Sequence, residues 1–132
     1  GGVAYYERPP GPLDSLVHHV KTCVGMDVVR VSAPKGMRQT VSRIGLLIGG
    51  AGLCGNIGAQ ERLIQAGCDV LVSGESDNYG FRYAYECGVP TIETGHELSE
   101  MPGIRMFGAA LSAEFPHLRV TVVTDSPPWQ PA

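Results

Sequence analysis

A histidine and a glutamate four residues apart are the pair of side chains best suited to chemistry in this sequence. His96 follows Gly95 just beyond an apolar run at residues 89–92, and Glu100 lies four residues further on. Side chains at positions i and i+4 share one helix face, and imidazole with carboxylate is a ligand pair for zinc, iron or manganese. We predict that His96 and Glu100 bind a metal. The alternative is an ordinary helix start in which the dipole favours Glu100.

Glu75 is a second candidate, because it follows Gly74 in a short polar turn after another apolar run. A carboxylate here is suited to act as a general base, or to orient a metal ligand through a hydrogen bond. Capping of the next helix is the structural alternative.

A glycine-rich turn supports a rival hypothesis. Gly50, Gly52 and Gly55 fulfil the pattern G-x-G-x-x-G between an expected strand and an expected helix, which is the context of a dinucleotide-binding loop. Glu75 stands at about the position where such folds carry a ribose-binding acid. Glycines in such a turn also serve simple backbone needs, namely positive φ and close approach of chain segments. Dinucleotide binding therefore stays as an alternative.

The apolar pattern along the chain predicts strands that alternate with helices. Helices are expected at residues 13–24, 56–66, 77–86 and 99–115, and strands at residues 28–31, 44–48, 70–72, 89–92 and 120–123. This order indicates an α/β fold, a layered and largely parallel sheet flanked by helices. Residues 1–12 are expected to be an arm or linker, residues 13–124 the α/β domain and residues 125–132 a proline-rich tail.

The predicted topology brings the candidate residues together. The turns after residues 48, 72 and 92 all leave the same edge of a parallel sheet. We expect the glycine turn, Glu75, and His96 with Glu100 to surround one crevice, where open α/β sheets bind ligands.

The composition of the chain limits the kinds of binding partner and cellular location that we expect. The 132 residues carry 10 basic and 13 acidic side chains, a formal charge of −3 with no basic run, so nucleic acid is not expected as a partner. No apolar stretch is long enough to span a membrane and no signal region is visible, so a soluble cytoplasmic protein is expected. The four cysteines form no C-x-x-C pair, and we expect them to be reduced and mostly buried.

Several segments together resemble a known family. They are residues 44–55, 68–75, 87–92 and 95–100, with an opening, a first helix and a Ser126-Pro127-Pro128 ending that fit the same pattern. In order and spacing they resemble the second half of the Ngg1-interacting-factor-3-like family, also called the GTP cyclohydrolase 1 type 2 homologues. The G-H-x-x-x-E element at residues 95–100 is the most specific part.

The resemblance implies a fold of two similar α/β halves around a centre of two divalent metals, usually assembled as a toroidal homohexamer. His96 and Glu100 match the two ligands from the second half, and Glu75 matches an acidic position facing the cleft. The remaining ligands, a histidine pair and an aspartate, belong to the first half. Many relatives have histidines in the helix after Glu75, where this chain has Asn78 and Tyr79.

Three functions follow as hypotheses. The first is a metal-dependent hydrolase acting on a nucleotide-like small molecule, with His96 and Glu100 as ligands and Glu75 as catalytic base or supporting group. The second is a non-catalytic metal-binding or oligomeric assembly module. The third is the dinucleotide-binding domain suggested by the glycine turn.

Overall fold

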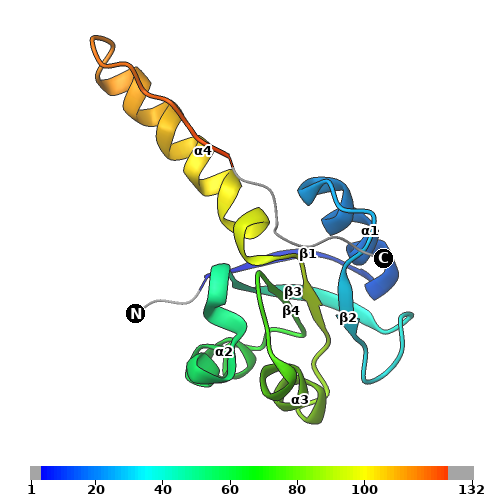
Figure 1. Ribbon diagram of the computed structural model, residues 1–132. Coiled ribbons are helices and arrows are strands. Elements are labelled where there is room, and N and C mark those ends of the chain that lie inside the picture. Colours follow the sequence, from blue (N-terminus) through cyan, green and yellow to red (C-terminus); the bar gives the residue numbers. More distant parts are fainter. Residues whose placement is uncertain (1–3, 125–132) are drawn as a thin grey trace.

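The computed structural model describes residues 4–124. It has three layers, a sheet with helix α1 on one face and helices α2 and α3 on the other, and a long helix α4 that projects from the body (Figure 1). The elements are β1 (Ala4–Pro12), α1 (Leu13–Val24), β2 (Arg30–Ser32), β3 (Thr40–Leu47), the 3₁₀ turns η1 (Gly49–Gly52) and η2 (Cys54–Asn56), α2 (Ile57–Gln65), β4 (Val70–Ser73), α3 (Asn78–Glu86), β5 (Thr91–Glu93) and α4 (His96–Glu114).

The five strands form one sheet in the order β1-β3-β4-β5-β2. The three central strands are parallel to one another, and the two edge strands pair antiparallel with their neighbours. The predicted α/β class, with a parallel sheet centre between helices, is confirmed.

The alternation of side chains along β4 creates two cores. Val70 packs with Leu13 and Leu16 of α1, whereas Leu71 packs on the opposite face with Leu63 of α2. Successive residues of a strand point to opposite faces of its sheet. The continuous apolar run of β4 therefore serves both helix layers, as expected for a central parallel strand.

The expectation that residues 1–12 form an arm or linker is wrong for residues 4–12. These residues form β1, which pairs antiparallel with β3 from Ala4 opposite Leu46 to Pro12 opposite Thr40, with a shift of register between Glu7 and Gly11. The prolines of this segment suggest a linker because they lack an N–H group. An edge strand tolerates them, since only one of its sides pairs.

The end of the chain also differs from expectation. Helix α4 begins at His96 rather than residue 99, and the strand expected at residues 120–123 is absent from the described chain, where residues 119–124 are irregular. A side chain added at Gly108 would meet Val122, so this segment runs back along α4. It has no strand of the sheet beside it to pair with. The predicted tail at residues 125–132 lies outside the described residues.

The cysteines are free, but only Cys68 is buried, whereas Cys23, Cys54 and Cys87 are exposed. The expectation of mostly buried cysteines was wrong. In the described part of the chain, no helix has the length and apolar character needed to cross a membrane.

Candidate metal half-site

Three turns meet beyond the carboxyl ends of β3, β4 and β5, and backbone hydrogen bonds hold them together. The N–H of Glu75 donates to the carbonyl of Gly49 at 2.9 Å, and the N–H of Gly95 donates to the carbonyl of Gly74 at 2.7 Å. The N–H of Gly49 donates to Ser99 Oγ at 2.9 Å. The three turns therefore lie together at one edge of the sheet, as the topology predicted.

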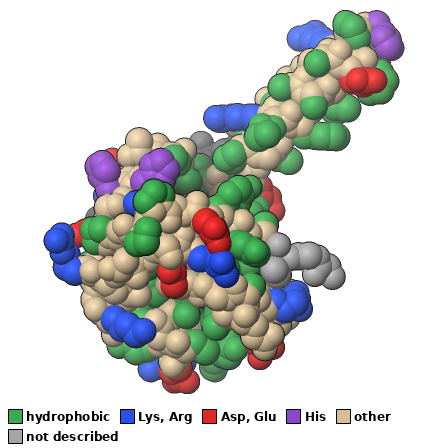
Figure 2. Space-filling model, turned by 180° about the vertical axis from the view of Figure 1, so that it is seen from behind, with side chains coloured by type: hydrophobic (Ala, Val, Ile, Leu, Met, Phe, Trp, Pro, Cys, Tyr) green, Lys and Arg blue, Asp and Glu red, His purple; other side chains and the backbone are tan. Residues whose placement is uncertain are grey.

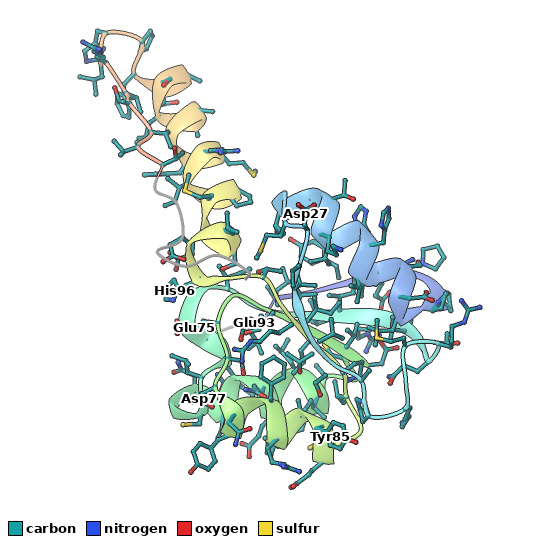
Figure 3. All side chains as sticks on the ribbon, turned by 45° about the vertical axis from the view of Figure 1, so that its right-hand side comes forward. Asp27, Glu75, Asp77, Tyr85, Glu93 and His96 are labelled. Atoms are coloured by element: carbon teal, nitrogen blue, oxygen red, sulfur yellow. The ribbon has the colours of Figure 1, made fainter. Side chains whose placement is uncertain are left out.

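His96 lies between the two predicted carboxylates. Its Nδ1 is 2.9 Å from Glu75 Oε2, and its Nε2 is 3.5 Å from Glu100 Oε1. Each of the three side chains is between 42% and 49% exposed, so solvent or a ligand reaches the group. Glu75 and His96 point toward each other at the base of α4 (Figure 3).

The start of helix α4 brings His96 and Glu100 to the same side of the helix. Gly95 has φ 99°, a conformation that favours glycine, and the helix starts at the next residue. His96 and Glu100 then stand one turn apart on the same face. Ser99 Oγ donates to the carbonyl of His96 at 2.7 Å, which fixes the first turn.

The hydrogen bond to Glu75 raises the pKa of His96, and the charge of Glu100 adds to this effect. A carboxylate on Nδ1 favours the tautomer in which Nδ1 carries the proton. In the neutral ring, Nε2 then presents its lone pair on the side of Glu100. Histidines that bind metals in proteins commonly have this arrangement.

The geometry fits one metal between Nε2 and Glu100. Two ligand atoms about 2.1 Å from a tetrahedral metal lie about 3.4 Å from each other, and the observed separation is 3.5 Å. The position beside them is open because residue 49 is glycine. A Cβ at Gly49 would collide with Glu100 Oε1 and lie 3.2 Å from His96 Nε2.

The described residues bring together two candidate metal ligands and no third. Within residues 4–124, no group of three or more His, Cys, Asp or Glu side chains is arranged to hold a metal ion. Glu75 does not complete such a group, because it binds the ring nitrogen that faces away from Glu100. A tetrahedral metal held by His96 and Glu100 needs ligands from elsewhere.

A cavity of about 560 Å³ opens beside His96. Its lining combines an apolar wall before β2 with polar groups at the sheet edge, namely Met26, Val28, Val29, Arg30, Glu75, Ser76, Glu93, Gly95, His96 and Glu97. The cavity volume is typical of sites for small molecules.

The sequence reasoning missed Arg30 and Glu93 in this wall. Arg30 donates from Nε and Nη2 to the two carboxylate oxygens of Glu93, at 2.9 and 2.5 Å. A signal for Glu93 exists in the sequence, because it is a charged residue at the end of an otherwise apolar strand. Nothing in the sequence marks Arg30 as its partner, 63 residues away.

The glycine turn lies near the site, and packing explains its central glycine, Gly52. The carbonyl of Gly52 accepts hydrogen bonds from Gln60 Nε2 and Ser76 Oγ, both at 2.9 Å. A Cβ at Gly52 would collide with Ser73 Oγ and lie 2.6 Å from the carbonyl oxygen of Glu75. Close approach of chain segments therefore requires this glycine without any ligand.

The other histidines lie apart from this group. His18 and His19 are exposed on α1, and His117 packs edge-on against Phe115 with ring centroids 6.4 Å apart.

The sequence matches the profile of the Duf34/NIF3 (NGG1p interacting factor 3) family over residues 2–128. The chain belongs to this family. The resemblance inferred from the G-H-x-x-x-E element and its neighbouring segments is thereby confirmed.

Individual relatives agree with the family assignment. The chain is 30% identical over 108 residues to a GTP cyclohydrolase 1 type 2 homolog of Pseudomonas aeruginosa, covering 82% of this chain and 39% of that protein. Among solved structures, it is similar to protein ybgI, of unknown function, with a TM-score of 0.78 and 25% identity over 96% of this chain and 49% of the other. Staphylococcus aureus protein SA1388 shares the fold, with a TM-score of 0.77 and 19% identity over 97% of this chain and 36% of the other.

This Duf34/NIF3 chain spans about two fifths of the curated relative and half or less of these two solved chains. The structural likeness covers nearly all of the present chain. The fold of this part of the family is therefore shown.

Proposed function

We propose that this chain supplies two ligands, His96 and Glu100, to a divalent metal, with Glu75 holding the imidazole in the orientation that binding requires. The observation that carries the proposal is the 3.5 Å separation of His96 Nε2 and Glu100 Oε1 next to the space left by Gly49. Zinc, iron and manganese all accept such a ligand pair.

In the complete protein we expect two such metals, with the missing ligands from a part of the family fold that these residues do not contain. The half-site is consistent with this, because it offers one histidine and one carboxylate on an accessible face. A homohexamer is the assembly that the family resemblance implies, and here it is part of the proposal.

The reaction we propose is hydrolysis of a small nucleotide-like molecule. A bound divalent metal would supply Lewis acidity and lower the pKa of bound water. The P. aeruginosa relative is named a GTP cyclohydrolase 1 type 2 homolog, which agrees with a nucleotide-like substrate. The chain's own contribution is the cavity beside His96, with the Glu75 carboxylate placed to accept a proton from a molecule bound there.

Metal content measures the proposed binding directly. Protein stripped of metal should take up zinc, iron or manganese in equilibrium dialysis, and the His96→Ala/Glu100→Ala double variant should take up less. A matched control is His117→Ala/Glu114→Ala, which removes the same residue types from exposed positions beyond the half-site. Equal metal in all three proteins, or none in any, would contradict the proposal.

Helix α4 supports a second candidate, a non-catalytic assembly module. It projects from the body with apolar side chains along it (Figure 2), and Ile104, Met106 and Phe107 are 49%, 75% and 63% exposed. Apolar surfaces of this kind mark contacts between proteins. Bound metal without turnover of any nucleotide, together with self-association through α4, would favour this candidate over the hydrolase.

A further inference from the structure

Arg30 and Glu93 form a two-bonded ion pair across the edge of the sheet. They are direct partners in the antiparallel pairing of β2 with β5. Glu93 is 13% exposed and Arg30 62%, and the guanidinium lies over the Phe81 ring, 5.0 Å from its centroid. A planar guanidinium with paired donors suits this geometry, whereas a lysine would provide a single point charge.

Both partners of this pair also bind the main chain of Ser76, the residue after Glu75. The N–H of Ser76 donates to Glu93 Oε2 at 2.8 Å, and Arg30 Nη2 donates to the carbonyl of Ser76 at 2.8 Å. The ion pair is therefore hydrogen-bonded to both the N–H and the carbonyl group of Ser76. Ser76 is 4% exposed, so its end of both contacts is buried.

The peptide that joins Glu75 to Ser76 is held from its other side as well. Its carbonyl, that of Glu75, accepts a hydrogen bond from Ser73 Oγ at 2.9 Å. The Ser76 hydroxyl donates to the carbonyl of Gly52 at 2.9 Å. With every neighbouring polar group engaged, the backbone of Glu75 has a defined position from which its side chain reaches His96.

We propose that Arg30 and Glu93 are positioning residues for the half-site. Their hydrogen bonds to the main chain of Ser76 hold the neighbouring Glu75 so that its carboxylate lies against His96 Nδ1. The imidazole is then oriented with Nε2 toward Glu100. This inference rests on the proposed metal-binding function. Glu75, Glu93 and His96 lie near one another at one end of the sheet (Figure 3). Arg30 lies opposite Glu93 on the neighbouring strand β2.

The opposite edge of the sheet contains a matched control pair. Glu7 and Arg43 are direct partners in the pairing of β1 with β3. Arg43 donates to Glu7 from Nε at 3.1 Å and from Nη2 at 2.5 Å, to the carbonyl of Ala66 at 2.6 Å, and lies 5.3 Å from the Tyr5 ring centroid. Like Arg30 and Glu93, this pair joins an arginine and a glutamate that face each other on neighbouring strands, but it bonds through one oxygen of Glu7 and lies away from the half-site.

The test compares Arg30→Met and Glu93→Gln with Arg43→Met and Glu7→Gln. Zinc affinity is measured by competition with a chromogenic chelator, and the protonation of His96 Nδ1 is followed in metal-free protein by long-range ¹H–¹⁵N NMR. Partners that orient a metal-binding histidine affect affinity by about 10- to 100-fold, and for this more distant pair we expect about tenfold. The conservative Glu93→Gln change keeps the shape of the side chain, and thermal unfolding identifies any variant that is not folded.

The outcomes separate the inference from the proposed function. Weaker zinc binding and less Nδ1–H in the Arg30 and Glu93 variants, with neither change in the Arg43 and Glu7 variants, would support positioning. Unchanged zinc affinity in the folded Arg30 and Glu93 variants, when Glu75→Ala weakens it, would overturn positioning alone. If wild-type protein bound no zinc, the proposed function would fail, and an unaltered His96 signal in the variants would then overturn the inference too.

Discussion

The imidazole of His96 stands between two carboxylates, with Nδ1 2.9 Å from Glu75 Oε2 and Nε2 3.5 Å from Glu100 Oε1. The two carboxylates thus have different tasks. Glu75 lies against Nδ1 and favours the Nδ1–H tautomer, whereas Glu100 lies beside Nε2, the nitrogen that we propose binds a metal.

Removing Glu75 should weaken metal binding without removing a ligand. For Glu75→Ala we expect zinc affinity to fall by about 10- to 100-fold, because His96 loses the acceptor that orients it. Isothermal titration of metal-free protein with zinc would measure this. Glu86→Ala, at an exposed position at the end of α3, is the control and should bind zinc as the wild type does. A Glu75→Ala protein with wild-type affinity would refute the orienting role.

Gly49 should not tolerate a side chain. Its φ is 60°, and an added Cβ would collide with Glu100 Oε1. We expect Gly49→Ala to lower the free energy of unfolding by about 1–3 kcal/mol through backbone strain and to displace Glu100, with loss of zinc binding. Gly55→Ala is the matched control, since a Cβ there meets nothing within 4 Å. Urea unfolding and zinc titration of both variants measure the two effects, and equal behaviour would contradict the packing argument.

Asp77 gives the fold a defined dependence on pH. Its carboxylate accepts hydrogen bonds from the N–H groups of Gly80 and Cys54, at 2.8 and 3.0 Å, and these bonds lower the pKa of Asp77 to about 2. Because the folded pKa lies below the ordinary value of 3.8, Asp77 stabilises the fold above pH 3.8 and this contribution is lost as the pH falls toward 2.

The variant that isolates this effect is Asp77→Asn, which retains a side chain able to cap α3 but has no charge to lose. Urea unfolding at several pH values should show wild type more stable than the variant at pH 5 to 7, by an amount that shrinks as the pH falls toward 2. A difference that stayed constant over this range would show that the charge of Asp77 does not contribute.

Polar substitutions on α4 should reduce self-association. Met106 and Phe107 are 75% and 63% exposed on the projecting helix, and burial of such side chains is the main driving force for association. We expect Met106→Ser/Phe107→Ser to raise the dissociation constant for self-association by about tenfold or more, because two large apolar side chains lose their burial. Sedimentation velocity would detect the change, with Ala109→Ser/Ala110→Ser as control. An unchanged distribution would place the contact elsewhere.

The central fold was predictable because local patterns and tertiary demands agree there. The apolar runs that became β3, β4 and β5 are covered by helices on both faces, so hydrophobicity alone identified them. The edges were less predictable. The prolines of β1 favoured the prediction of a linker, although this segment pairs with β3. Residues 120–123 have the composition of a strand, but no strand of the described residues lies beside them.

The site shows the same division. His96 and Glu100 were predictable because their i to i+4 spacing fixes their relation within a single helix. Glu75 was predictable from the shared sheet edge. Arg30 was not, since its pairing with Glu93 depends on β2 lying beside β5, and residue spacing does not reveal which strand occupies an edge.

The most direct measurement is a crystal structure of the protein grown with zinc, with anomalous diffraction collected at the zinc absorption edge. We predict an anomalous peak about 2.0–2.2 Å from both His96 Nε2 and a carboxylate oxygen of Glu100, with Glu75 hydrogen-bonded to His96 Nδ1. A fully occupied zinc bound elsewhere, with His96 and Glu100 free of metal, would contradict the assignment of this pair as a metal half-site.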